Sequence, residues 1–257
     1  MSYISGKNFG IEVALGRVAG YAKVNKFGQA DDCDSGVATD IWDGADGALS
    51  TDIWVAPTTA RTHDLKSSEA ADASAGTGMR TVQVYGLTAW DAKETSETVT
   101  LNGITNVATA NAYVIIHRMK GVTFGADETN AGNITATAQT DTTITAAIKA
   151  GEGQTLMLIY GIASGQKLCI TAGSATALKG VSTARIDATW MAKENADQSD
   201  CAFVTKMRFS FSSTAGMGGS YSPPLSYTGP CIVKLQVVSD TNGVQVAATF
   251  DAYVVDI

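Results

Sequence analysis

The sequence predicts an all-β protein, a jelly-roll-like antiparallel β-sandwich preceded by an extended N-terminal arm. Three observations predict it. From residue 81 onward, short runs alternate between apolar and polar residues, as strands do when one face is buried. Gly, Asn, Asp and Ser separate these runs, and those residues favour turns. No stretch has the periodicity of a helix longer than two turns.

We divide the chain into an N-terminal arm with accessory strands, residues 1–79, and the sandwich, residues 80–257. Residues 9–15 alternate briefly, as an extended arm or an edge strand would. Residues 29–50 are acidic and rich in glycine, and residues 67–78 form an Ala/Ser/Asp/Gly linker with turn character. The arm is therefore the irregular part of the predicted fold.

The arm also holds the first candidate contacts with a partner. The tetrapeptide Thr-Asp-Ile-Trp occurs twice, ending at Trp42 and at Trp54, and it predicts two short strands that each present a tryptophan. Phe9 and Ile11 lie on the alternating segment near the N-terminus. Tryptophan offers a large apolar area and is enriched at interface hot spots, so we predict a partner interface here. The alternative is that both tryptophans cover the sandwich core.

The sandwich is predicted from about ten strands with turn signals between them, a spacing typical of two-sheet folds. Asn102-Gly103 and Asn242-Gly243 are strong hairpin signals. A jelly roll uses eight strands, and further strands would extend its sheets. In order, the predicted strands cover residues 81–87, 97–101, 113–119, 133–138, 143–148, 156–160, 168–172, 184–190, 203–211, 231–238 and 244–255, with a loop over 212–224.

Composition narrows the function classes. The 45% hydrophobic share is that of a folded protein, and charged residues make up only 17%, which suits a subunit packed against neighbours or a monomer with a Thr/Ser-rich surface. The net charge of −7 argues against nucleic acid as a partner, because phosphate binding needs a basic face. No apolar stretch is long enough to predict a membrane span, and no apolar leader segment is visible, so we expect folding in a cytoplasm.

The residues that usually carry chemistry are sparse. His63 and His117 are the histidines of the chain, and no Gly-x-Ser-x-Gly elbow accompanies them, so we expect His117 to be packed. Asp32-Cys33-Asp34 resembles the start of a calcium loop but lacks the downstream glutamate. The remaining cysteines, Cys169, Cys201 and Cys231, form no metal-binding spacing and are expected to be free thiols. We therefore predict no enzyme, no cofactor and no metal.

Two aromatic residues in predicted loops keep a second function class open. Trp90 precedes a charged connection that contains Asp91 and Glu94, which we interpret as a polar loop and not as a pair of catalytic acids. Tyr221 lies beside two prolines. Such aromatics could stack on a sugar ring, although loop aromatics pack against neighbouring proteins at least as often, so both residues join the candidate interface.

Four segments carry a resemblance to a known group of proteins. They are residues 20–28 (GYAKVNKFG), 71–87 (ADASAGTGMRTVQVYGL), 151–157 (GEGQTLM) and 250–256 (FDAYVVD). On these segments the chain resembles a widespread group of virion proteins of tailed bacteriophages. The match spans most of the chain, although its motifs consist of turn and strand signals.

The resemblance implies a structural role with no catalytic residues. We expect a capsid decoration or cement protein that binds the major capsid protein or other virion proteins, assembles as a trimer or dimer, and stabilises the capsid lattice of the virion. The alternatives are a tail or head-surface adhesin that binds host glycan, or a tail adaptor or ring protein.

Overall fold

The structure is a computed structural model that describes residues 8–44, 49, 51–179 and 184–257. It is all-β with antiparallel sheets, with 56% of residues in strands and one short helix, α1 (Phe9–Ala14), within the described part of the chain. The predicted all-β class is therefore confirmed. The strands are β1 (Tyr21–Cys33), β2 (Ala38–Asp40), β3 (His63–Ser67), β4 (Met79–Leu87), β5 (Thr95–Thr100), β6 (Val107–Ala108), β7 (Ile115–Phe124), β8 (Ile134–Ala138), β9 (Thr143–Ile148), β10 (Ile159–Ile162), β11 (Gln166–Lys179), β12 (Arg185–Glu194), β13 (Val204–Ser212), β14 (Met217–Thr228), β15 (Cys231–Ser239) and β16 (Val244–Asp256).

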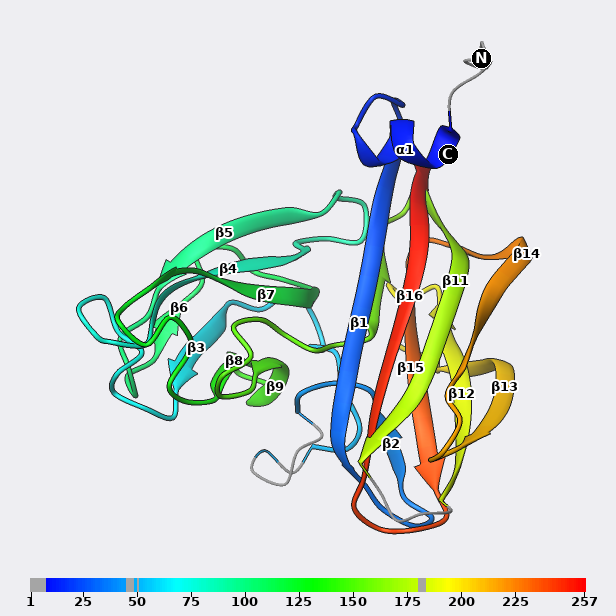
Figure 1. The fold of residues 1–257 in the computed structure, drawn as a ribbon. Coiled ribbons are helices and arrows are strands. Elements are labelled where there is room, and N and C mark those ends of the chain that lie inside the picture. The colour runs from blue at the N-terminus through cyan, green and yellow to red at the C-terminus, as the bar shows by residue number, and fades with distance from the viewer. Residues whose placement is uncertain (1–7, 45–48, 50, 180–183) are drawn as a thin grey trace.

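Two sheets form the larger part of the molecule, which we call the main lobe (Figure 1). One sheet has the strand order β1-β16-β11-β14, and the other has the order β10-β15-β12-β13, with β2 also paired to β15. Between the sheets, the Trp190 ring in β12 and the Phe250 ring in β16 meet edge to face at a centroid distance of 5.4 Å. Edge-to-face packing of this kind is favourable for aromatic pairs.

The last strand follows the sequence pattern closely. Val244, Val246, Ala248 and Phe250 are buried, and the residues between them are partly exposed. β16 lies between β1 and β11, so its backbone groups are paired on both sides and its alternate side chains fill the core. This strand is consequently the centre of its sheet.

A second group of strands, which we call the inserted lobe, extends sideways from the main lobe (Figure 1). It consists of a sheet with the order β6-β3-β8-β9 and a sheet with the order β5-β4-β7. Its core includes Leu65, Val82, Val84, Met119 and Ile134, all fully buried. The five residues come from strands of both sheets, so the lobe has a hydrophobic core of its own.

The inserted lobe interrupts a single strand of the main lobe. β2 and β10 run in the same direction along the same edge of β15, where Asp40 pairs with Gln236 and Ile159 pairs with Lys234. Between them, the Ile41 amide donates to Leu235 at 3.0 Å. The Leu158 amide in turn donates to the Ile41 carbonyl at 2.9 Å, so the chain leaves and rejoins the strand at neighbouring points. Residues 42–157 are therefore an insertion within one strand.

A buried ion pair holds the first half of the interrupted strand. The Lys234 ammonium in β15 lies 2.5 Å from the Asp40 carboxylate in β2, and both side chains are almost completely buried. Asp40 also accepts hydrogen bonds from Gln236 Nε2 and from the Trp54 amide. Because a buried carboxylate requires several donors to replace water, this arrangement favours one position of β2 on β15.

The boundary between arm and sandwich differs from the expectation. We placed residues 1–79 in an arm, whereas β1 pairs with β16 from Tyr21 to Cys33 and forms one edge of a main-lobe sheet. Residues 9–14 form the helix α1 rather than an extended segment. Residues 80–148, which we assigned to the sandwich, belong to the inserted lobe. Alternation of apolar and polar residues predicts which side chains face a core. It does not predict whether neighbouring strands share one core or belong to two adjacent cores.

The segment 212–224 also differs from its prediction. We expected a loop because it is rich in Gly, Ser and Pro, but residues from Met217 onward form β14. β14 pairs with β11 alone within its sheet. An edge strand tolerates proline and glycine because one side of its backbone needs no partner strand. The composition is thus that of an edge strand.

Candidate partner-binding surface

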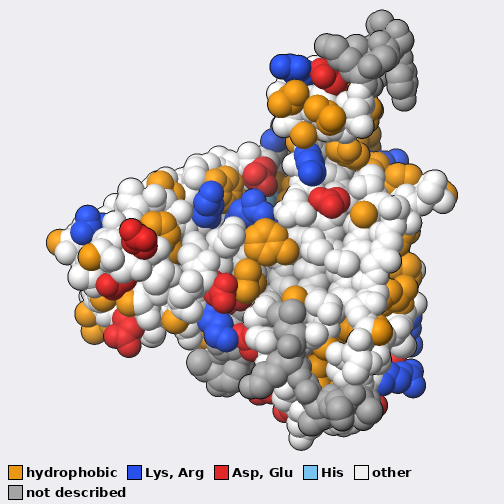
Figure 2. All heavy atoms as spheres, viewed as in Figure 1, with side chains coloured by type: hydrophobic (Ala, Val, Ile, Leu, Met, Phe, Trp, Pro, Cys, Tyr) orange, Lys and Arg blue, Asp and Glu red, His pale blue; other side chains and the backbone are white. Residues whose placement is uncertain are grey.

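The helix α1 presents an apolar surface at one end of the main lobe, beside the C-terminus (Figure 1). The Asn8 side chain caps the helix by accepting a hydrogen bond from the Ile11 amide at 3.4 Å. Val13 is buried, while Phe9, Ile11 and Leu15 are 43%, 56% and 55% exposed. We call these three residues the helix patch. Figure 2 shows apolar side chains gathered on this projecting end of the molecule.

Contacts with the strands below hold the helix patch in place. The Phe9 ring meets the rings of Tyr21 in β1 and Tyr253 in β16, with centroid distances of 5.3 and 5.9 Å. Glu12 is buried and pairs with Arg17 at 3.6 Å. The helix is too short to be stable by itself, so these contacts keep it folded. Phe9 and Ile11, predicted as interface residues from a strand pattern, are exposed on a helix instead, and their role in an interface stays a prediction.

Trp42 and Trp54 do not present the surfaces that we expected of them. Both side chains are fully buried. Trp42 Nε1 donates to the Thr51 carbonyl at 3.0 Å, and Trp54 Nε1 donates to the Thr145 carbonyl at 2.8 Å. A buried indole with its N–H satisfied contributes to a core and has no area left for a partner. The two tryptophans therefore correspond to the alternative that they cover a core.

Trp90 lies at a groove between the lobes. The groove has a volume of about 770 Å³ and is lined by residues 53–60, Trp90 and Val114 on one side and by residues 196–199 and 201–203 on the other. Ile53 and Val55 are exposed at this groove. Trp90 itself is partly buried, so one part of its ring surface remains accessible.

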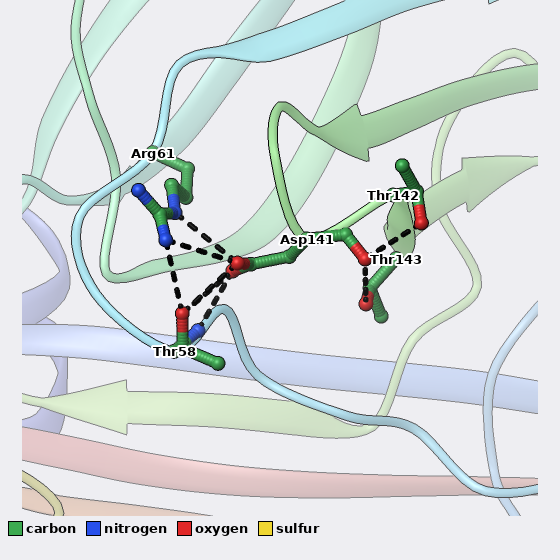
Figure 3. A network of polar contacts seen from close by, with 5 residues as sticks. All are labelled: Thr58, Arg61, Asp141, Thr142 and Thr143. Carbon is green, nitrogen blue, oxygen red and sulfur yellow. Dashed lines mark hydrogen bonds and ion pairs between the residues drawn. The ribbon is translucent and has the colours of Figure 1, made fainter.

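A polar network holds the 57–61 segment at the rim of this groove (Figure 3). The Asp141 carboxylate accepts hydrogen bonds from the Thr58 amide and hydroxyl, both at 2.9 Å, and from the Arg61 guanidinium at 3.1 Å. The Asp141 carbonyl accepts from the hydroxyls of Thr142 and Thr143. Five donors on one residue fix the turn between β8 and β9 against the groove. They also hold the pKa of the Asp141 carboxyl below its usual value, chiefly through the Thr58 amide and Arg61.

Tyr221 lies at the open side of the main lobe. Here the two sheets end in the edge strands β13 and β14, and a cavity of about 220 Å³ opens between them. Tyr221, Met207, Phe209 and Met217 line the cavity together with core residues such as Trp190. The surface is apolar and partly accessible, so it is a second candidate contact, distant in sequence from the helix patch.

The predicted interface residues therefore do not form one surface. Phe9 and Ile11 belong to the helix patch, Trp90 to the groove between the lobes, and Tyr221 to the open side of the main lobe. Alternation and residue type identified which side chains are large and apolar. They carried no information on which of them the chain folding would bring together.

Sequence reasoning missed a polar cluster where the two lobes meet. Lys26 in β1 donates a short hydrogen bond to the His117 carbonyl in β7, and the Arg118 guanidinium donates to the Asn25 carbonyl in β1 at 3.1 Å. His117 Nε2 lies 2.6 Å from the Glu94 carboxylate. The two lobes thus exchange side chain-to-backbone contacts in both directions. From the sequence, Lys26 was placed in the arm, Glu94 in a loop and His117 in a strand, and no local pattern connects them.

Burial controls the charges in this cluster. Removal from water, with a smaller repulsion from Arg118, lowers the pKa of Lys26 to about 7, although Glu94 opposes the shift. Burial likewise lowers the pKa of His117 despite the adjacent Glu94 carboxylate. The imidazole is consequently neutral near pH 7, which agrees with the prediction that His117 is packed. His117 Nδ1 is buried with no hydrogen-bond partner in the described part of the chain.

The remaining groups considered for chemistry are dispersed. His63 is buried in β3, and burial lowers its pKa to about 4. Burial raises the pKa of the Cys33 and Cys231 thiols to about 12, which makes them poor nucleophiles. All four cysteines are free. Among residues 8–44, 49, 51–179 and 184–257, no three His, Cys, Asp or Glu side chains are grouped as metal ligands would be.

Within the same described residues, no helix has the length and apolar character needed to cross a membrane. Comparison with known proteins adds no relative: no protein-family profile matches the chain, and no curated protein sequence is significantly similar to it.

Proposed function

We propose that the main lobe is a jelly roll and that the protein is a structural subunit of a tailed-phage virion, a decoration or cement protein of the capsid. The observation that carries the proposal is the order of the strands. With β2 and β10 counted as one interrupted strand, the described residues of the main lobe form eight strands. Numbered along the chain, they have the orders 1-8-3-6 and 2-7-4-5 in the two sheets, the arrangement produced by two Greek keys and common in viral capsid domains.

The surface properties support a role in assembly. The chain carries few charged residues for its size, and the helix patch exposes three large apolar side chains on a projecting end. Exposed apolar patches of this kind mark sites of protein association. We assign the helix patch to the contact with the major capsid protein or another virion protein. Many copies on a lattice, as trimers or dimers, would add modest contacts into stable binding.

A second candidate is a head-surface or tail adhesin that binds host glycan. Jelly rolls also occur in lectins, and the groove beside Trp90 combines an accessible aromatic ring with polar side chains such as Thr58, Asp197 and Gln198. A tail adaptor or ring protein would keep the structural role and change only the partner.

One experiment separates these functions. Purified protein is mixed with phage particles that lack it, and bound protein is measured after sedimentation. We expect the wild type to bind and the variant Ile11→Ser, alone or with Phe9→Ser, to lose at least about tenfold in affinity, because removal of an apolar hot spot costs about 2 kcal/mol or more. Val204→Ser is the matched control, since Val204 is an equally exposed apolar residue on β13.

The outcomes differ for each function. Wild-type protein that does not sediment with particles, or helix-patch variants that bind as well as Val204→Ser, would contradict the capsid assignment. The variant Trp90→Ala should bind particles normally under this assignment. Normal particle binding by Trp90→Ala together with lost attachment of the particles to host cells would favour the adhesin.

A further inference from the structure

The junction between the lobes encloses a small polar pocket. It has a volume of about 170 Å³, several times the roughly 30 Å³ that one water molecule occupies in the liquid. Its walls come from three sheets, since β1 and β10 belong to the main lobe and β4 and β7 to the inserted lobe. It is lined by Lys23, Val24, Asn25, Lys26, Tyr85, Glu94, His117, Arg118 and Tyr160.

The charge of this pocket is opposite to that of the protein. Lys23 and Arg118 are cationic and Lys26 becomes cationic as the pH falls through about 7, against the single carboxylate of Glu94. That carboxylate is already engaged by His117 Nε2 at 2.6 Å. The chain as a whole has a net charge of −7, so the pocket is opposite in sign to the protein. Figure 2 shows Lys and Arg side chains gathered where the two lobes meet.

Several donors in the pocket have hydrogen bonds left to make. Lys26 is 97% buried, and its ammonium has three N–H groups, of which the His117 carbonyl accepts one. Tyr160 is more than nine-tenths buried, and its ring lies 4.6 Å from the ring of His117. Its hydroxyl has no partner among the described residues. The Arg118 guanidinium donates one hydrogen bond to the Asn25 carbonyl.

We propose that this pocket binds a small tetrahedral oxyanion, a sulfate or phosphate group, between Lys26, Arg118 and Tyr160. Such an anion accepts several hydrogen bonds at once, and charge-assisted bonds of this type are the strong ones. Bound there, it would contact strands of both lobes and hold them in one relative position. The exposed Lys23 and the half-exposed Glu94 mark the entrance. The proposal does not depend on the role in a virion.

The proton on Lys26 couples binding to pH. Lys23, Arg118, Glu94, His117, Tyr85 and Tyr160 are the titratable and charged groups that face it in this pocket. With the pKa of Lys26 at about 7 and that of His117 lowered by burial, Lys26 is the group that gains charge between pH 8.5 and 6. Sulfate is a suitable probe because its own charge does not change there. We expect its affinity to fall by up to about thirtyfold from about pH 6 to about pH 8.5.

The test is calorimetric titration of sulfate into the full-length protein, at constant ionic strength maintained with sodium chloride. Wild type should bind with a stoichiometry of one. At about pH 6, Lys26→Met should weaken binding at least about tenfold, and Tyr160→Phe, which retains the ring and every charge, should weaken it by a few fold. Lys66→Met is the control, because Lys66 is exposed on β3, a strand that does not line the pocket.

Specific binding must be distinguished from the general stabilisation that sulfate gives all proteins. No binding heat from wild type, or equal affinities for wild type and Lys26→Met, would overturn the proposal. Should Lys26→Met fail to fold, Tyr160→Phe decides, and an affinity equal to that of wild type would also overturn it. A phosphate monoester is titrated in parallel. Tighter binding than sulfate assigns the site to a phosphate group on a larger molecule, and weaker binding assigns it to the free ion.

Discussion

Lys26 is buried under the inserted lobe with its ammonium next to a carbonyl, and this burial determines how stability depends on pH. Its pKa is lowered to about 7 in the folded protein and returns to its ordinary value of 10.5 on unfolding. Between these values the unfolded chain binds the extra proton. Stability should therefore rise as the pH increases from about 7 to about 10, by at most about 1.4 kcal/mol per pH unit.

The variant Lys26→Met isolates this contribution. It keeps most of the apolar stem and removes the titrating amine, so its stability should lack this rise. The measurement is urea unfolding of both proteins from neutral to alkaline pH, in buffers that contain no sulfate or phosphate. Parallel stability curves for the two proteins would show that Lys26 is not buried as the structure has it.

At this scale, residue type predicts what a side chain could do, and tertiary structure determines whether it does. Trp42 and Trp54 were predicted as contacts because tryptophan is frequent at hot spots, and the same large apolar area explains why both are buried. Ile11 was chosen because it lies on an alternating segment read as an extended arm, and it is exposed on a helix at the end of the sheets. Nothing in the sequence predicts that Lys26 and His117 lie next to each other.

At the scale of elements, α1 and β1 should differ sharply in their importance. α1 contributes one fully apolar buried residue, Val13, whereas β1 pairs with β16 from Tyr21 to Cys33. Deletion of residues 1–18 should leave a cooperative fold with a modestly lower melting temperature. Deletion of residues 1–34 removes a whole edge strand and exposes the backbone of β16, so we expect aggregation or loss of cooperative unfolding.

Thermal unfolding followed by circular dichroism, with gel filtration of both truncated proteins, checks this expectation. A soluble, cooperatively folded protein lacking residues 1–34 would mean that the region is a dispensable arm, as the sequence suggested. The same comparison serves as a folding control for particle binding. A deletion that includes β1 would abolish binding by unfolding the main lobe, whether or not the deleted residues contact the particle.

Elements were predictable where one strand faces one core. β16 and β12 show clear alternation and were located within a few residues. β14 was missed because its prolines and glycines are typical of loops, and its place at the sheet edge removes the need for strand-forming residues. β1 was missed because it was assigned to the arm, and its last residues, 29–33, belong to the acidic, Gly-rich stretch that suggested irregular structure.

For the whole molecule, the insertion could not be predicted, because its boundaries lie inside a strand and not at a linker. The short strands β2 and β10 together form one strand along β15. The 116 residues from 42 to 157 separate Ile41 from Leu158 in the chain. Local patterns describe both lobes as alternating strands. The two lobes are distinguished by which strands pair with which, and these pairings join residues far apart in the chain. Amino-acid composition does not predict such pairings.

The same geometry predicts that the two lobes can be separated. Ile41 and Leu158 are joined by a hydrogen bond of 2.9 Å, so a short Gly-Ser linker can replace residues 42–157 without moving either end. Trp42, Asp43 and Trp54 bond to groups inside the insertion, which should therefore retain its own core when expressed alone. We expect both pieces to fold.

The excised main lobe should be less stable than the full chain, since it loses the hydrogen bond from the Trp54 amide to Asp40 and the contacts of Lys26 with β7. Amide hydrogen exchange measures the outcome: β15 and β16 should remain protected in the excised protein, with faster exchange near Asp40 and Lys26. Loss of protection throughout β15 would mean that residues 42–157 are required to complete the interrupted strand. In that case the two lobes would form one folding unit, and the junction pocket would be part of a shared core rather than a contact between separate bodies.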